Sequence, residues 1–361
     1  MTISAELTQE LVTFLQQQLN DKNYCRAKLI LLFGAGNTIV NNINWDTALS
    51  NIIPIIIERL DGYGRLNGEI VLCGFLRLIG EDLGEDFQER IRQLVQKIQG
   101  ANSENLYHSL SKLNFSKQDK IFYELIKASS IAAFLIHGEP EYGQKWLLNR
   151  LVHKYCPNSV KSKNVQINIG SLVKKNDMNS LLRELARKLG LQGKQCTLSE
   201  IVKGINKWLE SQNVLLILSQ VGIVPETNLI ELMKNFWEPL SSEIKNFQSQ
   251  PNEYKLFMFL IDDIGYVKSW NNTNIFAETL NCDWKPQTPI KAPEITALLR
   301  DDLDDWIRYE YNSLPSQLKK PCVPQIILEN SENGVPEQVL YQICAHCGYD
   351  WYEESTNWLK L

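Results

Sequence analysis

Apolar residues recur at helical spacing through the first hundred positions of the chain. This periodicity predicts helices over residues 7–19, 24–33, 45–60, 68–79 and 87–98, separated by brief glycine-rich turns. No strand-like alternation interrupts them. The pattern therefore predicts a compact antiparallel all-α bundle of five or six helices over residues 1–99.

Two features bear on how these helices begin and bend. Pro54 lies inside the third pattern and predicts a kink or a break, because proline removes a backbone donor and clashes with the preceding turn. Asp46 is expected near the start of the same helix. Glu85 or Asp86 is expected to cap the fifth helix.

The pattern changes after a short polar stretch at residues 100–105, which predicts a linker and a second domain over 106–361. Helices are expected at 106–113 and 116–128. Apolar runs predict buried strands at 131–136, 165–169, 214–218 and 255–261, with helices at 147–155, 179–189, 198–210 and 337–347.

The strand at 131–136 runs directly into a glycine loop and then a helix, which is the context of a phosphate-binding P-loop. Gly138 and Gly143 have the P-loop spacing, with four residues between them. A working P-loop continues with a lysine that reaches the phosphates and a hydroxyl residue that holds magnesium. Gln144 and Lys145 occupy these positions. An uncharged amide thus replaces the cation, and a protonated lysine cannot ligate a metal.

Two other properties of the loop point the same way. Glu139 and Glu141 add negative charges that should repel a triphosphate. Lys145 stands one position late, and a shift of one helical residue rotates a side chain by about 100° and moves it by about 1.5 Å. It would have to turn back into the loop to reach a phosphate.

The acid that completes such a site is also missing from the expected strand end. In P-loop order, the strand at 214–218 should end in an acid, yet it ends in Ser219 and Gln220. Asp262 and Asp263 follow the later strand instead. They are interpreted as a solvated strand end that caps the next turn, with a magnesium-organising role as the alternative. The sequence therefore predicts no cofactor and no catalytic residues.

Five acidic residues cluster where the fourth predicted helix ends and the fifth begins: Glu81, Asp82, Glu85, Asp86 and Glu89. One interpretation is a solvated helix junction, since acids are favoured near a helix N-terminus. The other is half of a charged docking surface, because opposite charges speed encounter and select partners.

Two other groups are interpreted as structural. Cys344 and Cys347 surround His346, but a single Cys-x-x-Cys supplies two ligands and a structural zinc needs four. They are expected to face the core of a helix, and no metal site is predicted. His137, directly before the glycine loop, is expected to pack and hydrogen-bond at the strand end.

Composition narrows the function classes. The 361 residues include 37 Lys and Arg against 42 Asp and Glu, a net charge of −5, which disfavours a dedicated nucleic-acid or anionic-membrane binder. No apolar run approaches the roughly 20 residues of a membrane span, and the N-terminus lacks a signal-peptide layout. A cytoplasmic protein with reduced thiols is expected.

The N-terminal bundle resembles the effector-associated domains of cyanobacterial conflict and signalling proteins. The residues that carry the resemblance are Arg26 with Leu29–Leu32, Trp45, the Gly62–Gly68 turn, Phe75, Leu76 and Ile79. Members of this group are death-fold-like adaptor bundles. The resemblance implies recruitment of a separate effector that carries a matching helical domain.

The second half resembles the inactive STAND domains, which are degenerate relatives of signal-transducing P-loop ATPases. The match rests on 134–140 and 142–151, with support from 113–115, Gln118, 236–240 and 257–262. Gln144 and Trp146 are unusual in an active loop and typical of this group. The resemblance implies an α/β P-loop NTPase-like fold, with a mainly parallel sheet and helices on both faces.

Together these observations predict a non-enzymatic signalling adaptor of bacterial defence that partners with an effector protein, with no nucleic acid and no membrane. The main alternative is a nucleotide-binding or ATP-hydrolysing switch that uses Lys145 and Asp262. A nucleic-acid-binding defence protein is a second alternative, which the acidic balance disfavours.

Overall fold

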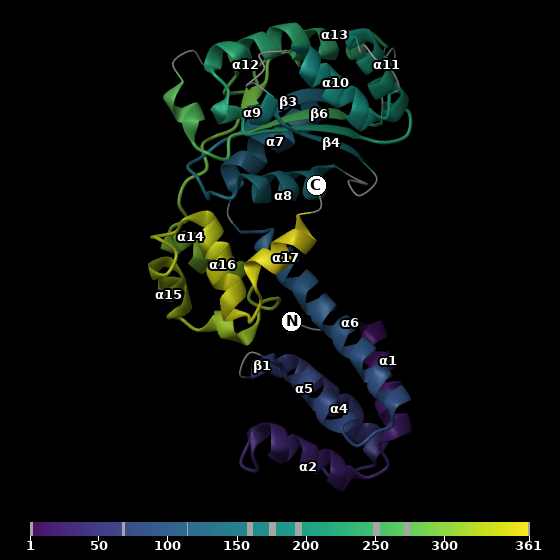
Figure 1. Cartoon of the computed structure of the whole chain (residues 1–361). Helices are drawn as coiled ribbons and strands as arrows, with labels where there is room; N and C mark the ends of the chain where they lie inside the picture. The colour runs from purple at the N-terminus through teal and green to yellow at the C-terminus, as the bar shows by residue number, and fades with distance from the viewer. Residues whose placement is uncertain are drawn as a thin grey trace. The chain divides into compact units, whose positions relative to one another are not determined.

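The chain folds into two compact units (Figure 1). The computed structural model describes residues 3–66, 69–113, 115–156, 162–172, 178–191, 197–247, 253–270 and 275–359. The helical unit comprises 1–113, 299–332 and 339–358, and the α/β unit comprises 114–298, 333–338 and 359–361. Within the described residues, every helix is too short or too polar to cross a bilayer.

The N-terminal part of the helical unit is an all-α bundle, as the periodicity predicted. Its helices are α1 (Ala5–Gln18), α2 (Lys22–Phe33), α3 (Thr38–Asn41), α4 (Leu49–Tyr63), α5 (Val71–Gly80) and α6 (Glu85–Leu110). One continuous apolar core joins them. A small antiparallel pair, β1 (Arg65–Leu66) with β2 (Glu69–Ile70), was not predicted, because two-residue strands contain no alternation to recognise.

The third predicted helix begins later than expected. Trp45 lies in a turn, where its indole N–H donates to the Val40 carbonyl at 3.0 Å, and the backbone N–H of Asp46 donates to the Asn44 side chain at 3.1 Å. Residues 44–46 thus use side-chain bonds that compete with helix formation. Asp46 is not at the helix start, because α4 begins at Leu49.

Pro54 does not split α4, which runs through it to Tyr63. Proline cannot donate to the Ser50 carbonyl, four residues earlier. The side-chain amide of Gln16 on α1 donates to that carbonyl instead, at 3.2 Å. The neighbouring helix therefore satisfies the acceptor that the proline leaves, and the helix continues.

The last helix of the bundle runs through the stretch that was expected to be a linker. α6 extends through residues 100–105 to Leu110, and its cap is Gly84, with Glu85 and Asp86 in the first turn. Its later residues pack on C-terminal helices of the same unit: Trp306 donates to the Ser109 carbonyl at 2.7 Å, and Trp358 donates to the Ser103 hydroxyl at 3.2 Å. Burial of this face keeps a polar segment helical, so the boundary drawn at 100–105 stays a prediction.

Four helices complete the C-terminal region. They are α14 (Arg300–Tyr309), α15 (Val323–Glu329), α16 (Pro336–His346) and α17 (Trp351–Trp358). Trp306, Trp351 and Trp358 are buried, whereas Tyr309 and Tyr352 are exposed. The aromatic residues of this segment therefore divide between the core and the surface.

The α/β unit is a five-stranded parallel sheet in the order β4-β5-β6-β3-β7, which confirms the predicted fold class. Its strands are β3 (Ile131–Ile136), β4 (Lys163–Asn168), β5 (Val214–Ser219), β6 (Leu256–Ile261) and β7 (Ile290–Lys291). Its helices are α7 (Ser116–Ala128), α8 (Gln144–Tyr155), α9 (Ile169–Leu172), α10 (Met178–Leu189), α11 (Leu198–Leu209), α12 (Glu226–Leu232) and α13 (Glu238–Phe247). In Figure 1, α10, α11 and α13 cover one face of the sheet, and α7 and α8 cover the other.

Both faces of the sheet are buried, which is why its central strands read as continuous apolar runs. Phe122 of α7 illustrates the packing on one face: its ring centroid lies 5.2 Å from that of Phe134, 5.8 Å from that of Phe257 and 5.7 Å from that of Phe259. β3 lies between β6 and β7 in this sheet, with the glycine loop at its carboxyl end.

Candidate functional site

The glycine loop links β3 to α8, as the P-loop context predicted. Gly143 has a φ of +75°, a left-handed conformation that favours glycine, and it precedes the first residue of α8. The loop is tightly covered at its start. A Cβ on Gly138 would lie 3.1 Å from Ile295, whose backbone N–H donates to the His137 carbonyl at 3.0 Å.

Gln144, at the position of a phosphate-binding lysine, is 3 % exposed and turned into the loop. Its side-chain amide donates to the carbonyl oxygen of Glu139 at 2.8 Å and to that of Gly138 at 3.2 Å. The residue thus satisfies buried backbone acceptors of the loop. It carries no charge with which to hold a phosphate.

Lys145 does not turn back into the loop. Its side chain is exposed on the first turn of α8, and it forms no ion pair with any residue that the structure describes. Lys145 thus lies on the solvent side of the helix, as the rotation of one helical position requires.

The two loop carboxylates are engaged by partners that the sequence did not reveal. Glu139 pairs with Lys268 at 3.1 Å, and Lys268 also pairs with Glu294 at 3.2 Å. The carboxylate of Glu141 accepts the Gln338 side-chain amide at 2.8 Å, and the backbone carbonyl of Glu141, which has a φ of 64°, accepts the Glu337 N–H at 3.0 Å. These partners lie more than a hundred residues away, so local spacing contains no signal for them.

The acids of the β6 strand end separate into two environments. Asp262 is fully buried, and its carboxylate accepts the backbone N–H groups of Ile264 at 3.3 Å, Gly265 at 3.1 Å and Val267 at 2.8 Å. It caps the following turn, as one interpretation expected, but it is not solvated. Asp263 is half-buried, and its Oδ1 has no hydrogen-bond partner within the described residues.

The strand order places these acids directly beside the loop. β6 pairs with β3 on one side and β5 on the other. Ser219 and Gln220 therefore end a strand one position further from the loop, and Gln220 has a φ of 59°. The cation, the hydroxyl and the acid of a working site are thus replaced at the named positions by Gln144, Lys145 and Ser219.

His137 is buried at the end of β3, with its Nε2 2.9 Å from the Ala292 carbonyl. Burial lowers its pKa, because desolvation disfavours the charged imidazolium. A neutral ring whose Nε2 donates to the carbonyl fits this position. The residue packs and hydrogen-bonds at the strand end, as expected.

The Cys-x-x-Cys pair lies in the core of the helical unit. Cys344 and Cys347 are both buried free thiols. Burial raises the pKa of both, that of Cys347 to about 12, so neither is a thiolate at neutral pH. Within the described residues, no group of three or more potential ligands could hold a metal ion.

The acidic cluster of the bundle is exposed, but its members are not equivalent. Asp82 pairs with the buried Lys28 at 2.8 Å and accepts the Tyr24 hydroxyl at 2.8 Å. Hydrogen bonding from Lys28 lowers the pKa of the Asp82 carboxyl. Glu89 pairs with Arg92 at 3.0 Å. Asp82 is therefore part of the fold, whereas Glu81, Glu85 and Asp86 face solvent beside the exposed Phe87.

The fold and the loop define a P-loop type α/β unit joined to a helical bundle. Two family models match these parts: residues 5–98 match "Effector-associated domain 8", and residues 110–261 match "inactive STAND". The two matches follow one another along the chain in the order that the resemblances implied. A search of curated proteins finds no match. This combination is of the regulatory or signalling adaptor kind.

Proposed function

We propose that this protein is a non-enzymatic cytoplasmic adaptor of a bacterial defence or signalling system, whose N-terminal bundle docks onto a separate effector that carries a matching helical domain. The observation that carries the proposal is the glycine loop. Gln144 binds the loop's own carbonyls, and Lys145 points to solvent. In this proposal the loop's polar groups hydrogen-bond to each other and do not bind a nucleotide. The α/β unit then serves as a platform for protein interactions.

The docking surface that we propose consists of Glu81, Glu85, Asp86 and Glu89 around the exposed Phe87. Exposed acids supply charge complementarity, which steers encounter and selects a partner. Phe87 is 42 % exposed and offers an aromatic anchor in the same stretch of the chain as the acids. We infer that the effector presents a basic face with an apolar pocket.

Binding measurements with bundle-bearing proteins from the same genome test this function. The full chain is immobilised and each candidate is measured by pull-down and size-exclusion chromatography. One of them should bind, and a triple variant, Glu81→Gln with Glu85→Gln and Asp86→Asn, should lose that binding. The matched control changes three exposed acids elsewhere on the bundle: Glu6→Gln, Asp46→Asn and Glu58→Gln.

The possible outcomes test the adaptor role and the acidic docking surface separately. Failure of every candidate to bind the natural protein would overturn the adaptor role. Binding that survives the triple variant, or that the control loses equally, would overturn the acidic surface alone. Asp82 is left unchanged because its bonds to Lys28 and Tyr24 belong to the fold.

One observation favours the rival function of an ATP-dependent switch. The Asp263 Oδ1 is shielded from solvent beside the loop and has no partner within the described residues, as an acid awaiting a hydrated metal would be. Calorimetric titration with Mg·ATP separates the two functions. Micromolar binding that is lost in Lys145→Ala would establish the switch and contradict the adaptor mechanism.

A further inference from the structure

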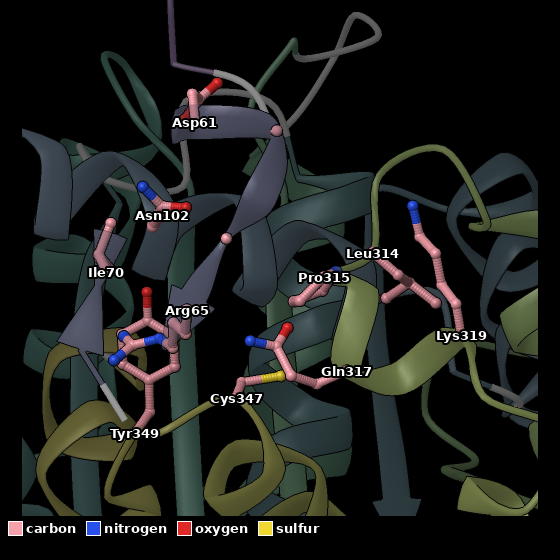
Figure 2. Close-up of a pocket in the computed structure, with 12 residues that line it drawn as sticks. Asp61, Arg65, Ile70, Asn102, Leu314, Pro315, Gln317, Lys319, Cys347 and Tyr349 are labelled. Atoms are coloured by element: carbon pink, nitrogen blue, oxygen red, sulfur yellow. The ribbon is translucent and has the colours of Figure 1, made fainter. Parts of the chain in front are cut away.

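The small cavity of the helical unit, drawn in Figure 2, has cationic side chains that are already engaged. The guanidinium carbon of Arg65 lies 4.3 Å from the centroid of the Tyr349 ring, and Arg65 also hydrogen-bonds to the Tyr349 hydroxyl. The ammonium of Lys319 lies 4.8 Å from the centroid of the Tyr311 ring. These side chains therefore stabilise the helical unit itself.

The parallel sheet of the α/β unit ends in a regular, open strand. β4 is the outermost strand on its side of the sheet (Figure 1). It has six residues and pairs with β5 in one continuous register, from Lys163 opposite Val214 to Asn168 opposite Ser219. It contains no proline, and its one charged residue is Lys163 at the start. Edge strands are usually shortened, bulged, charged or covered, because an open edge pairs with other chains.

The opposite edge of the sheet has the protection that β4 lacks. β7 has only two residues and lies between Pro289 and Pro293. Ala277 covers its outer side: the Lys291 N–H donates to the Ala277 carbonyl at 2.8 Å, and the Ala277 N–H donates to the Pro289 carbonyl at 2.9 Å. The fold thus closes this edge with proline and a covering segment.

The backbone groups of β4 that point away from β5 belong to Asn164, Gln166 and Asn168. The Lys163 N–H donates to the Asn213 carbonyl of the β5 side at 2.8 Å, and the direction of these groups alternates along a strand. Within the described residues, the outward backbone groups of Asn164 and Gln166 make no hydrogen bond. The Asn168 carbonyl accepts the Ser171 hydroxyl at 2.8 Å, which leaves its second lone pair available.

The side chains of these outward residues are all amides on one face of β4. Val165 and Ile167, which alternate with them, are buried in the core, whereas Gln166 and Asn168 are exposed. An amide both donates and accepts hydrogen bonds, so it pairs with an identical amide across a strand boundary. The edge is therefore complementary to a copy of itself.

We propose that β4 pairs antiparallel with β4 of a second copy of this chain, about a two-fold axis through Gln166, so that the two sheets become one. Gln166 then faces Gln166 of the second copy, and Asn164 faces Asn168, which is the register that uses all three outward residues. Lys163 falls opposite Ile169, so the charges of the two strands do not face each other. Such a dimer carries two N-terminal bundles, which raises the apparent affinity for a dimeric effector.

Sedimentation velocity of the full chain, from micromolar to millimolar concentrations, tests this pairing. The natural chain should dimerise reversibly, with dissociation in the micromolar range, because a single strand pair is a small interface. Gln166→Lys and Gln166→Glu each place like charges across the axis and should weaken dimerisation by about tenfold or more. An equimolar mixture of the two variants should form a heterodimer, because opposite charges then face each other. The matched control, Asn235→Lys, adds the same charge at another exposed amide of the α/β unit and should leave dimerisation unchanged.

A natural chain that stays monomeric over this range overturns the proposal and leaves the edge to an extended peptide of another protein. Dimers that tolerate both charged variants, or that Asn235→Lys weakens equally, form through another surface and also overturn it. So does failure of the mixed variants to pair, because the two Gln166 side chains then do not meet. Effector binding through the bundle does not involve β4, so its pull-down gives an independent result.

Discussion

The side-chain amide of Gln144 lies 2.8 Å from the carbonyl oxygen of Glu139 and donates a hydrogen bond to it. This bond joins the first residue of α8 to the loop that precedes it. A side chain that reaches inward in this way has a structural role, because it satisfies acceptors that are shielded from water. The residue that replaces a catalytic lysine thus helps to hold the loop closed.

Gln144→Ala should destabilise the protein. The Gly138 and Glu139 carbonyls would each lose a donor, although Glu139 keeps the Tyr142 N–H at 3.3 Å, and an unsatisfied buried acceptor costs about 1–3 kcal/mol. Urea denaturation measures the free energy of unfolding. Lys145→Ala, one position along and exposed, serves as the control and should change it by less than about 0.5 kcal/mol. Equal effects of the two variants would contradict the structural role of Gln144.

Asp262→Asn should lower the free energy of unfolding by about 2 kcal/mol, because three backbone N–H groups lose a charged acceptor. Asp263→Asn is the matched control and should cost less, since Asp263 has one oxygen without any partner in the described residues. The same denaturation experiment compares them. A larger loss in Asp263→Asn would show that the capping bonds of Asp262 contribute little.

The strands of the α/β unit were predictable because their chemistry is local. β3 and β6 are buried on both faces, so continuous apolar runs mark them in the sequence. α7 was predicted with its observed bounds from helical periodicity alone. The residues that follow Gly143 are also given by the sequence itself, so the loss of the phosphate-binding lysine could be inferred without the structure.

What could not be predicted depends on residues far apart in the chain. Pro54 looked like a break because Gln16, which satisfies the Ser50 carbonyl, is remote in sequence. Glu139 and Glu141 looked like unpaired charges, since Lys268 and Gln338 could be assigned to them only by the fold. The local sequence indicates which conformation or charge pairing a residue favours. Contacts with residues remote in the chain determine whether the folded protein provides it.

Stability should depend on pH through His137. Its pKa is lowered in the folded protein, so below about pH 6.5 the unfolded chain binds a proton that the folded chain does not. The free energy of unfolding therefore falls as pH falls from about 6.5, by at most about 1.4 kcal/mol per pH unit for one proton. His137→Gln keeps an amide donor for the Ala292 carbonyl and cannot titrate. Its stability should fall less steeply over this range, as measured by urea denaturation at several pH values, and parallel curves would contradict the assignment.

Gly100→Ala tests the continuous course of α6. Gly100 lies in the interior of this helix, is exposed, and has no atom within 4 Å of the position that a Cβ would take. Alanine is favoured over glycine in a helix interior by about 0.5–1 kcal/mol, because glycine has more backbone freedom to lose on folding. The variant should raise the free energy of unfolding by that amount.

The control for this prediction is Gly84→Ala, at the cap of the same helix, where the added Cβ also meets no atom. Alanine is a poor N-cap, so this variant should not stabilise the chain. If residues 100–105 were a linker outside regular structure, Gly100→Ala would gain no helical preference and would resemble the control. If only Gly100→Ala raises the free energy of unfolding, the helix must pass through residues 100–105. The last helix of the bundle then continues to the residues that contact α14 and α17.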